Sequence, residues 1–587
     1  MWFSFMLRRP KSRRNAGCPR TSIIPRFEIL EGRTLPSTLT VLNTLDKGAG
    51  SLRDAITNAK SGDTIVFASS LAGQTIVLTS DQLTINNSLD IEGPGAGLLT
   101  VSGNDTNRVF DINEGLAVTI AGLTITHGRA VGGNGNPGGA GGGGAILNVG
   151  STVSLANDVF SANVSLGNSD GPKGGAIANF GTGSLTVTDS TFINNLADGR
   201  IKKGQFAEGG AIFSTRDGPS ITAIRCTFIG NEAIGGDGGV LATGQFAIGA
   251  ASGGALHIEG ASTLTVKDSV FLGNEAIGGN GGSAAKGSNQ GAYVVDSGEG
   301  GAIVNHDGGT LVISGSTFMT NEAIGGSNAS GAAVPLGFLS VGLGGGLDTE
   351  GPTTITDSTF VGNEALGGSG NTGGSGTGVL LVGAGFGGGL DNESFGFAAP
   401  LTISNCTFTN NQAVGGAANT GGLLPGDGWG GGISNFNWVT ATVTASIFTS
   451  NQAIGGAGGA GGNGADGLGG ALANVLGASL TVSGCTLTGN QALGGAGGSG
   501  ANGGNGHGGG VYSDSQSTLT VTGTTITSNS AIGGAAGSGG IAGQGMGGGV
   551  YFATGGVVCL DQYTVSNIEG NTASTSNNDI FGVFTIC

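Results

Sequence analysis

The sequence predicts an all-β fold, a single-stranded right-handed parallel β-helix (a solenoid) of about 14 coils, with a short N-terminal capping helix and Gly-rich loops at one corner. Two motifs that recur in a fixed order carry this prediction. The first is Gly-Gly-(Ala/Gly)-(Ile/Leu/Val), as at Gly174–Ile177, and the second is an aromatic or aliphatic residue followed three positions later by Asn, as at Phe192 and Asn195. A unit repeated in this way must stack on its neighbours to bury its apolar face.

The spacing of the two motifs separates a constant segment from a variable one. From each Gly-Gly pair to the next Phe-type position the chain runs about 18 residues, as from Gly508 to Ile526. From the motif Asn to the following Gly-Gly pair it runs from about 11 to about 26 residues. Since surface loops tolerate changes in length, the variable segment is predicted to leave the stack at one corner and return to it.

The constant segment consists of short β-rich runs. In the coil from Gly469 to Asn490 these runs are 471–475, 479–483 and 486–488, in which small, β-branched and Leu residues alternate. No window shows the 3.6-residue period of an amphipathic helix. Three short strands per turn describe one coil of a parallel β-helix, and the unpaired strand edges require the next coil to stack about 4.8 Å away.

Stacking brings equivalent residues into columns. One column is apolar and is expected to point into the core, with Leu487 and Ile526 continuing it: Phe160, Phe192, Phe228, Phe271, Phe318, Phe360, Phe408 and Phe448. A second column has Asn on every coil, where side-chain amides can pass hydrogen bonds from coil to coil: Asn163, Asn195, Asn231, Asn274, Asn321, Asn363, Asn411, Asn451, Asn490 and Asn529. We interpret both columns as structural.

The chain divides into four predicted segments. They are a basic N-terminal targeting or disordered segment (1–37), an N-terminal cap with the first irregular coils (38–142), the repeat β-helix (143–550) and a C-terminal cap (551–587). Residues 51–60 have the pattern of the capping helix, with Ser51 as its N-cap and apolar side chains on one face.

Composition excludes some classes of function. The formal net charge is −17 although the first 36 residues are basic, so the remainder is strongly acidic and unsuited to nucleic acid. No run of 18 apolar residues predicts a transmembrane segment. Cys226, Cys406 and Cys485 occupy one inward position on coils that are not adjacent, while the sequence leaves open whether Cys559 and Cys587 pair.

An acidic stretch breaks the regularity of the coils. The fourth and sixth positions after the first Gly of each Gly-Gly pair share one strand face, and we expect that face to point outward to solvent. On four successive coils the fourth position holds His257, Val304, Asp348 and Asp391. The sixth position holds Glu259, His306, Glu350 and Glu393. The candidate catalytic residues are therefore Asp348, Glu350, Asp391 and Glu393, within about two coil spacings of one another.

Three interpretations of this stretch remain open. It is a solvated acidic patch, a Ca²⁺ or saccharide contact site with Asp348 and Asp391 as metal candidates, or a site of glycosidic catalysis. A lyase also needs a basic residue, and Lys267 and Lys286 are the candidates that the sequence places nearby. The four His residues form no metal triad by their spacing.

The paired motifs resemble the Gly-Gly-Ala-Ile and Phe-x-x-Asn repeats of chlamydial polymorphic outer membrane proteins over residues 143–550. That resemblance implies a surface-displayed β-helix with a role in adhesion. Residues 38–67 are similar to the opening segment of many bacterial secreted right-handed β-helix proteins, and residues 27–37 (FEILEGRTLPS) look like the N-terminal signature of planctomycete surface proteins. Both resemblances imply export.

Two functions follow as hypotheses. The first is an exported, non-catalytic surface or extracellular protein, structural or adhesin-like, whose loop-decorated face meets an unidentified polysaccharide or protein. The alternative is a polysaccharide lyase or glycoside hydrolase that uses the carboxylates at 348–393. Neither requires a cofactor, although Ca²⁺ is the ion that the acidic stretch suggests.

Overall fold

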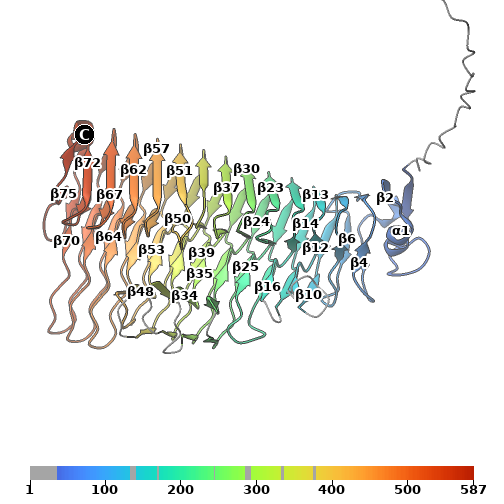
Figure 1. Cartoon of the computed structure of the whole chain (residues 1–587), viewed down its shortest axis with the longest axis horizontal. Coiled ribbons are helices and arrows are strands. Elements are labelled where there is room, and N and C mark those ends of the chain that lie inside the picture. The colour runs from blue at the N-terminus through green and yellow to red at the C-terminus, as the bar shows by residue number, and fades with distance from the viewer. Residues whose placement is uncertain are drawn as a thin grey trace, which may run out of the picture.

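The structure, a computed structural model, describes residues 36–132, 141–167, 171–242, 245–284, 292–331, 336–374 and 379–587. The described residues form one long rod of stacked coils (Figure 1). Helix α1 (Leu52–Asn58) lies at one end of the rod, and strands β72 (Val557–Leu560) and β75 (Ile580–Phe581) lie at the other. Strand pairing between the coils is parallel throughout the described ladders, which confirms the predicted parallel β-helix.

A coil in the middle of the chain contains more strands than the three predicted. The strands of one such coil are β35 (Gly298–Glu299), β36 (Ile303–His306), β37 (Thr310–Ser314), β38 (Thr317–Met319), β39 (Glu322–Ile324), β40 (Ser330–Gly331) and β41 (Leu336–Leu339). Each of them pairs with the equivalent strand of the coils before and after it. Strands β36, β37 and β38 are the three that the constant segment predicted.

Three of the resulting sheets enclose the core. The long sheet, which contains β37, has 16 strands; the Phe sheet, with β38, and the acid sheet, with β36, have 14 each. These numbers agree with the prediction of about 14 coils. One continuous cluster of buried apolar side chains fills the space between the three sheets along the length of the rod.

The corner predicted to hold loops is built from further sheets, which we call the wing. It comprises an 11-stranded sheet with β35, a 12-stranded sheet with β39, and on some coils a four-stranded sheet with β40 and a five-stranded sheet with β41. The first two pack closely, because a Cβ on Gly298 would lie only 2.4 Å from the backbone nitrogen of Ile324. Gly-rich composition here therefore permits close backbone packing rather than a loose loop.

The Phe column forms a continuous stack inside the rod. Rings on adjacent coils lie 4.6–4.8 Å apart between centroids and within 10° of parallel, from Phe160 to Phe448. All eight rings are fully buried. The spacing equals the distance between neighbouring strands, so each ring packs face to face on the next.

The Asn column forms a hydrogen-bonded ladder beside the Phe stack. From Asn163 to Asn529, each side-chain Nδ2 donates to the Oδ1 of the next Asn at 2.8–3.0 Å. The ladder ends at Asn571, whose Nδ2 and backbone nitrogen both donate to Asp579 Oδ1 at 2.9 and 3.1 Å. Because the column is fully buried, this bonding satisfies amides that would otherwise be costly to bury.

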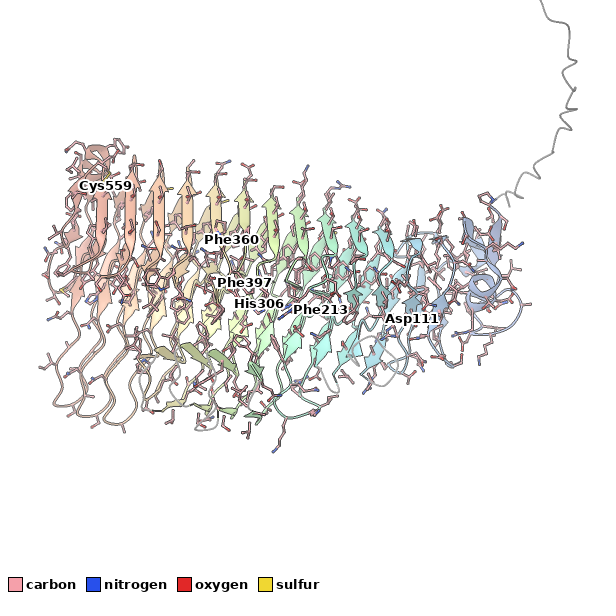
Figure 2. The ribbon with its side chains drawn as sticks, in the orientation of Figure 1. Asp111, Phe213, His306, Phe360, Phe397 and Cys559 are labelled. Atoms are coloured by element: carbon pink, nitrogen blue, oxygen red, sulfur yellow. A yellow bond between two sulfur atoms is a disulfide. The ribbon has the colours of Figure 1, made fainter. Side chains whose placement is uncertain are left out.

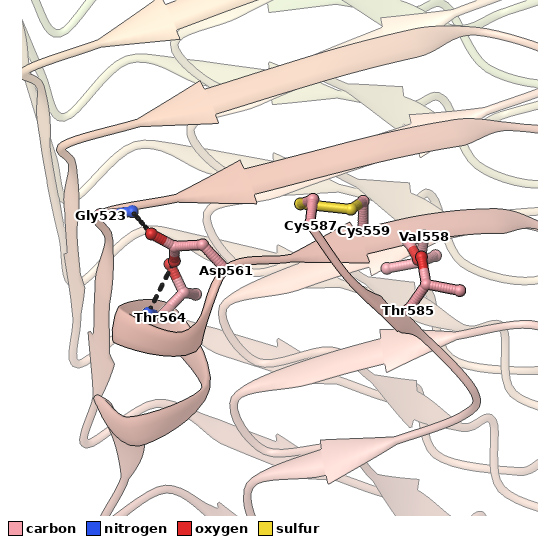
Figure 3. Close-up of a disulfide and its surroundings, with 7 residues drawn as sticks. All are labelled: Gly523, Val558, Cys559, Asp561, Thr564, Thr585 and Cys587. Carbon is pink, nitrogen blue, oxygen red and sulfur yellow. Dashed lines mark hydrogen bonds between the residues drawn. A yellow bond between two sulfur atoms is a disulfide. The ribbon is translucent and has the colours of Figure 1, made fainter.

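Both ends of the rod are covered. Ser51 caps α1 by accepting a hydrogen bond from Asp54 N, and Leu52, Ala55 and Ile56 are buried against the first coils. At the other end, Asp561 caps the short helix α2 (Gln562–Ser566) and also accepts a hydrogen bond from Gly523 N at 3.1 Å (Figure 3).

A disulfide between Cys559 and Cys587 closes the C-terminal cap (Figure 3). It joins β72 to the last strand, β76 (Thr585–Ile586), which pairs with β72 in parallel register. The sequence left this pairing open. Cys226, Cys406 and Cys485 are buried and free.

Candidate functional site

A groove of about 610 Å³ opens where the wing meets the acid sheet. Its walls come from β29 (Leu256–Glu259) and β36 of the acid sheet and from β16 (Pro172–Lys173), β21 (Ala207–Glu208), β27 (Ala247–Ile248), β34 (Ala292–Val295) and β35 of the wing. The polar side chains that line it are Lys173, Glu208, Arg216, Glu259, Glu299, His306, Asp307 and Glu350. Figure 2 marks its position midway along the rod by the labels of His306 and Phe397.

The predicted acidic columns lie outside the central core, but they are not solvated. Asp348 and Asp391 have 0% of their surface exposed, Glu393 has 1% and Glu350 has 5%. The expectation of a solvent-facing acidic patch is therefore wrong. The wing folds back over this face of the acid sheet, so both faces of its strands are buried.

Of the four predicted carboxylates, only Glu350 lines the groove among the residues that the structure describes. Asp348 is in register with Asp391 on the next coil, because β43 (Leu347–Thr349) pairs with β50 (Leu390–Asn392). Asp391 and Glu393 lie deeper still and do not line the groove. A substrate in the groove would thus meet Glu350 and not the other three.

His306 is the centre of the charged network. Its Nε2 lies 3.2 Å from Glu299 Oε2, 3.6 Å from Glu350 Oε1 and 3.8 Å from Asp348 Oδ2. Burial alone would lower the pKa of His306, but the carboxylates of Glu350, Asp348 and Glu299 together raise it well above its ordinary value. At neutral pH His306 is therefore an imidazolium that holds three acids around it.

Glu350 is poised to change its protonation state near neutral pH. Burial raises the pKa of its carboxyl group to about 7, opposed by the charge of His306. Its Oε2 accepts a hydrogen bond from Asp307 N at 3.2 Å, which fixes the orientation of the side chain. Burial likewise raises the pKa of Glu299, with His306 again opposing the shift.

The opposite end of the groove is organised by two cations. Lys173 forms an ion pair with Glu208 and lies 4.2 Å above the ring of Phe213. Arg216 forms ion pairs with both Glu259, at 3.0 Å, and Asp307. The lysine and the arginine of the groove lining are therefore both already paired with carboxylates.

His257 has the opposite character to His306. Burial, followed by the charges of His306 and Lys173, lowers its pKa well below the ordinary value, so it is neutral. Its Nδ1 lies 2.9 Å from Ser252 Oγ, and its Nε2 lies 3.6 Å from Glu208 Oε1. The two histidines, whose ring centroids lie 5.2 Å apart, thus differ in charge because only His306 faces three carboxylates.

Three groups of side chains in this region could hold a metal ion. Within each group the ligand atoms lie within 4.8 Å of one another: Glu208, His257 and Glu259; Glu299, His306 and Asp348; and Asp348, Asp391 and Glu393. The histidine spacing in the sequence did not predict that His257 and His306 each join two carboxylates. The third group contains carboxylates alone.

Four phenylalanine rings complete the groove: Phe206, Phe246, Phe395 and Phe397. Phe246 and Phe397 are about half exposed, at 49% and 46%. Phe206 and Phe395 pack against a second apolar cluster of the wing. The groove therefore combines a charged floor with an aromatic rim.

Several residues of the groove were missed from the sequence. Lys173, Glu208 and Glu299 each precede a Gly-Gly pair by one position, and a column drawn at that offset would have found them. Arg216 follows the acid sheet in a turn, where no column predicts it. Of the lysines proposed from the sequence, Lys267 is exposed on the long sheet and does not line the groove, and Lys286 lies outside the described residues.

The buried acids predict that the protein is most stable in mildly acidic solution. Burial raises the pKa of Glu350 and of Asp158 to about 7 and that of Asp427 to about 8. The folded state therefore binds these protons more tightly than the unfolded state, so their stabilisation is complete below the ordinary carboxyl pKa and is lost as the pH rises through 7 to 8. We expect the free energy of unfolding to fall between pH 5 and pH 8, at up to about 1.4 kcal/mol per pH unit for each of these groups that is still below its raised pKa.

Thermal unfolding in EDTA at several pH values between 5 and 8 measures this dependence. The double variant Asp158→Asn/Asp427→Asn, which keeps Glu350, should show a shallower decline. A melting temperature that rises across this range would contradict the prediction.

Within the described residues, no helix has the length and apolar character needed to cross a membrane.

No protein-family profile and no curated protein matches this sequence, so the resemblance to the chlamydial repeats and the planctomycete signature rests on the motifs themselves. Solved structures that are similar include the alginate lyase AlyF-OU02 in complex with G6, at 14% identity over 82% of this chain and 81% of that chain, with a TM-score of 0.33. A mutant tailspike protein of E. coli bacteriophage HK620 in complex with a pentasaccharide is 12% identical over 90% of this chain and 74% of that chain, with a TM-score of 0.32. The catalytic unit of a thermostable GH87 alpha-1,3-glucanase from Streptomyces thermodiastaticus is 12% identical over 88% and 68%, with a TM-score of 0.28. At these identities and TM-scores the similarity does not bear on the reaction or substrate of this chain.

Proposed function

We propose that the protein is a glycoside hydrolase that cleaves a neutral polysaccharide in the groove. The observation that carries this proposal is a pair of carboxyl groups on one groove floor that stand in different surroundings. Glu350 has its pKa raised to about 7 by burial and can donate a proton near neutral pH. Glu259 instead forms an ion pair with Arg216, with 3.0 Å between Oε2 and Nε. Paired carboxyl groups in different protonation states are what glycosidic hydrolysis requires.

The spacing of the two groups favours the inverting reaction. Glu259 and Glu350 belong to one column with His306 between them, which places them two coils, or about 9.6 Å, apart along the stack. Inverting enzymes separate their carboxyl groups by about 6.5–9.5 Å to leave room for a water molecule. In this scheme Glu350 protonates the leaving glycosidic oxygen, while Glu259 accepts a proton from the water that attacks the anomeric carbon.

The charge of the groove favours a neutral substrate over a polyuronate. Five carboxyl side chains line it, and both of its lysine and arginine side chains are already paired with acids. A uronate carboxylate would need an unpaired cation for neutralisation. The lyase that we considered from the sequence is therefore less suited to this groove than a hydrolase.

The aromatic rim and the size of the groove fit a sugar chain. Its volume of about 610 Å³ lies within the range of about 300–1,000 Å³ for small-molecule sites. Phe246 and Phe397 offer exposed ring faces against which apolar faces of sugar rings can pack. The disulfide between Cys559 and Cys587 supports export to an oxidising compartment, where a polysaccharide substrate would be met.

A second candidate is glycan binding without turnover, as an exported structural or adhesin-like protein would show. It is favoured by the half-exposed rings of Phe246 and Phe397, which serve binding whether or not a bond is cleaved. Under this alternative the carboxyl groups only accept hydrogen bonds from sugar hydroxyls.

The test is to incubate the full chain with a panel of neutral and acidic polysaccharides and to measure reducing ends and unsaturated products. We expect reducing ends from a neutral polysaccharide, and a loss of at least about 100-fold in rate for Glu350→Gln and for Glu259→Gln. Glu364→Gln, on β46 (Glu364–Leu366) of the wing and away from the groove, is the matched control and should keep its rate.

Each other outcome selects a different function. Unsaturated products would replace the hydrolase with a lyase. Binding of a glycan that is weakened by Phe397→Ala, without any product, would support the second candidate and overturn the first.

A further inference from the structure

Three carboxyl groups in this region take no part in the proposed reaction. Asp348, Asp391 and Glu393 are 0%, 0% and 1% exposed. Both side-chain oxygens of Asp348, both of Asp391 and Oε2 of Glu393 are buried without a hydrogen-bond partner. We call these three residues the acid trio.

The acid trio lacks a counter-charge of its own. The cation nearest to it is His306, whose Nε2 is 3.8 Å from Asp348 Oδ2 but closer to Glu299 and Glu350. Five buried carboxyl oxygens without a hydrogen-bond partner are unfavourable, since a buried charge must be paired, bound to a metal or neutralised. In the Asn ladder, by contrast, the buried amides are hydrogen-bonded from coil to coil.

The geometry of the trio matches a cation shell. One oxygen from each residue lies within 4.8 Å of the other two. Oxygens on opposite sides of a Ca²⁺ ion, each bound at about 2.3–2.6 Å, are about 4.6–5.2 Å apart, and those at right angles are closer. The chemistry agrees, because hard oxygen ligands with no sulfur or nitrogen favour Ca²⁺ over zinc or copper.

One further oxygen stands next to the trio. Ser434 pairs in register with Asp391 on the following coil, and its Oγ is buried without a hydrogen-bond partner. Asn392, between Asp391 and Glu393 in the chain, points to the opposite face of the strand, where its Nδ2 donates to Asn435 Oδ1 at 2.8 Å. Carbonyl and hydroxyl oxygens are accepted ligands in Ca²⁺ sites, which take six to eight of them.

We propose that Asp348, Asp391 and Glu393 bind one Ca²⁺ ion in the interior of the rod. The ion would join two successive coils. Asp348 lies on β43, which pairs with β36, and Asp391 and Glu393 belong to the coil after it, in which β50 pairs with β43. It lies outside the groove lining and is independent of the hydrolysis that we propose above. The ion would offset the repulsion among the three carboxylates and so stabilise the contact between the two coils.

The test measures metal in the full chain without any substrate. The protein is produced in the presence of Ca²⁺, dialysed against Ca²⁺-free buffer and analysed for metal by mass spectrometry. We expect one Ca²⁺ per chain to be retained, and a melting temperature at least about 2 °C lower after unfolding and refolding in EDTA than in 1 mM Ca²⁺.

The variant Asp391→Asn/Glu393→Gln keeps the shapes of the side chains and removes two charges. We expect it to retain no Ca²⁺ and to melt at the same temperature in Ca²⁺ and in EDTA. Asp427→Asn is the matched control: this acid is equally buried, but both of its carboxyl oxygens accept hydrogen bonds, so the variant should retain the ion.

Three results would overturn the proposal. They are wild-type protein that holds no Ca²⁺ and melts identically in Ca²⁺ and EDTA, retention of the ion by the double variant, and retention of a different metal. If the double variant does not fold, the metal content of the wild type and of Asp427→Asn still decides. Failure here leaves the hydrolase proposal intact, because the reducing-end assay does not depend on this ion.

Discussion

Replacing Asn321 with alanine is expected to destabilise the rod by about 3–6 kcal/mol. Its Oδ1 accepts hydrogen bonds from Asn274 Nδ2 at 2.9 Å and from Asn274 N at 3.0 Å. Its Nδ2 donates to Asn363 Oδ1 at 2.8 Å and to Phe271 O at 3.2 Å. Alanine removes four bonds at once and leaves buried polar groups on two neighbouring coils unpaired, at about 1–3 kcal/mol each.

Chemical denaturation, or melting temperature if unfolding is irreversible, measures this loss. The matched control is Gln491→Ala, which removes an amide that accepts a hydrogen bond from Gln452 Nε2 at 3.1 Å on a half-buried strand of the wing. Water can replace that bond, so the control should lose less than about 1 kcal/mol. Equal losses in the two variants would show that burial of the Asn ladder is not what makes it stabilising.

Replacing Phe318 with alanine is expected to cost about 3–5 kcal/mol. The ring is fully buried and stacks between Phe271 and Phe360 at centroid distances of 4.8 and 4.6 Å, with interplanar angles of 3° and 4°. Alanine opens a cavity between two rings that are held in place by the strand spacing and cannot move together to fill it.

The column itself supplies a milder variant for comparison. Leu487 and Ile526 occupy the Phe position on two later coils, so Phe318→Leu should cost less than about 2 kcal/mol. Met319→Ala, next in the chain and 38% exposed, should change stability by less than about 1 kcal/mol. A loss for Phe318→Ala no larger than that for Met319→Ala in thermal unfolding would contradict a close-packed stack.

The fold was predictable from the sequence because the residues that face inward repeat in a fixed register. Phe160 and Asn163 recur at a constant spacing, and a constant spacing is what strand stacking requires. The capping helix was visible from Ser51 and its apolar face for the same reason, since capping and amphipathicity are local properties.

The site was predictable only in part because its environment is made by the wing. Asp348 and Asp391 could be found as a column, but their burial depends on the segments that fold back over the acid sheet. Those segments vary in length from coil to coil, so the spacing of the motifs does not show that they fold back over the acid sheet. For Lys173 and Arg216, which come from other coils than the acids, only the fold shows that they share a groove with Glu350.

The C-terminal cap prevents further coils from pairing with that end of the rod. A coil at the end of a stack leaves open backbone edges in several sheets, to which the strands of a second chain could pair. At the last coil, Asp579 takes the place of a further Asn, and a carboxylate has no N–H with which to pass the ladder on. The final strand, β76, is tied across the end by the Cys559–Cys587 disulfide (Figure 3). Without the cap, the strand pairing that stacks the coils could also join rods end to end into fibres. The cap covers the edges at which such pairing would begin.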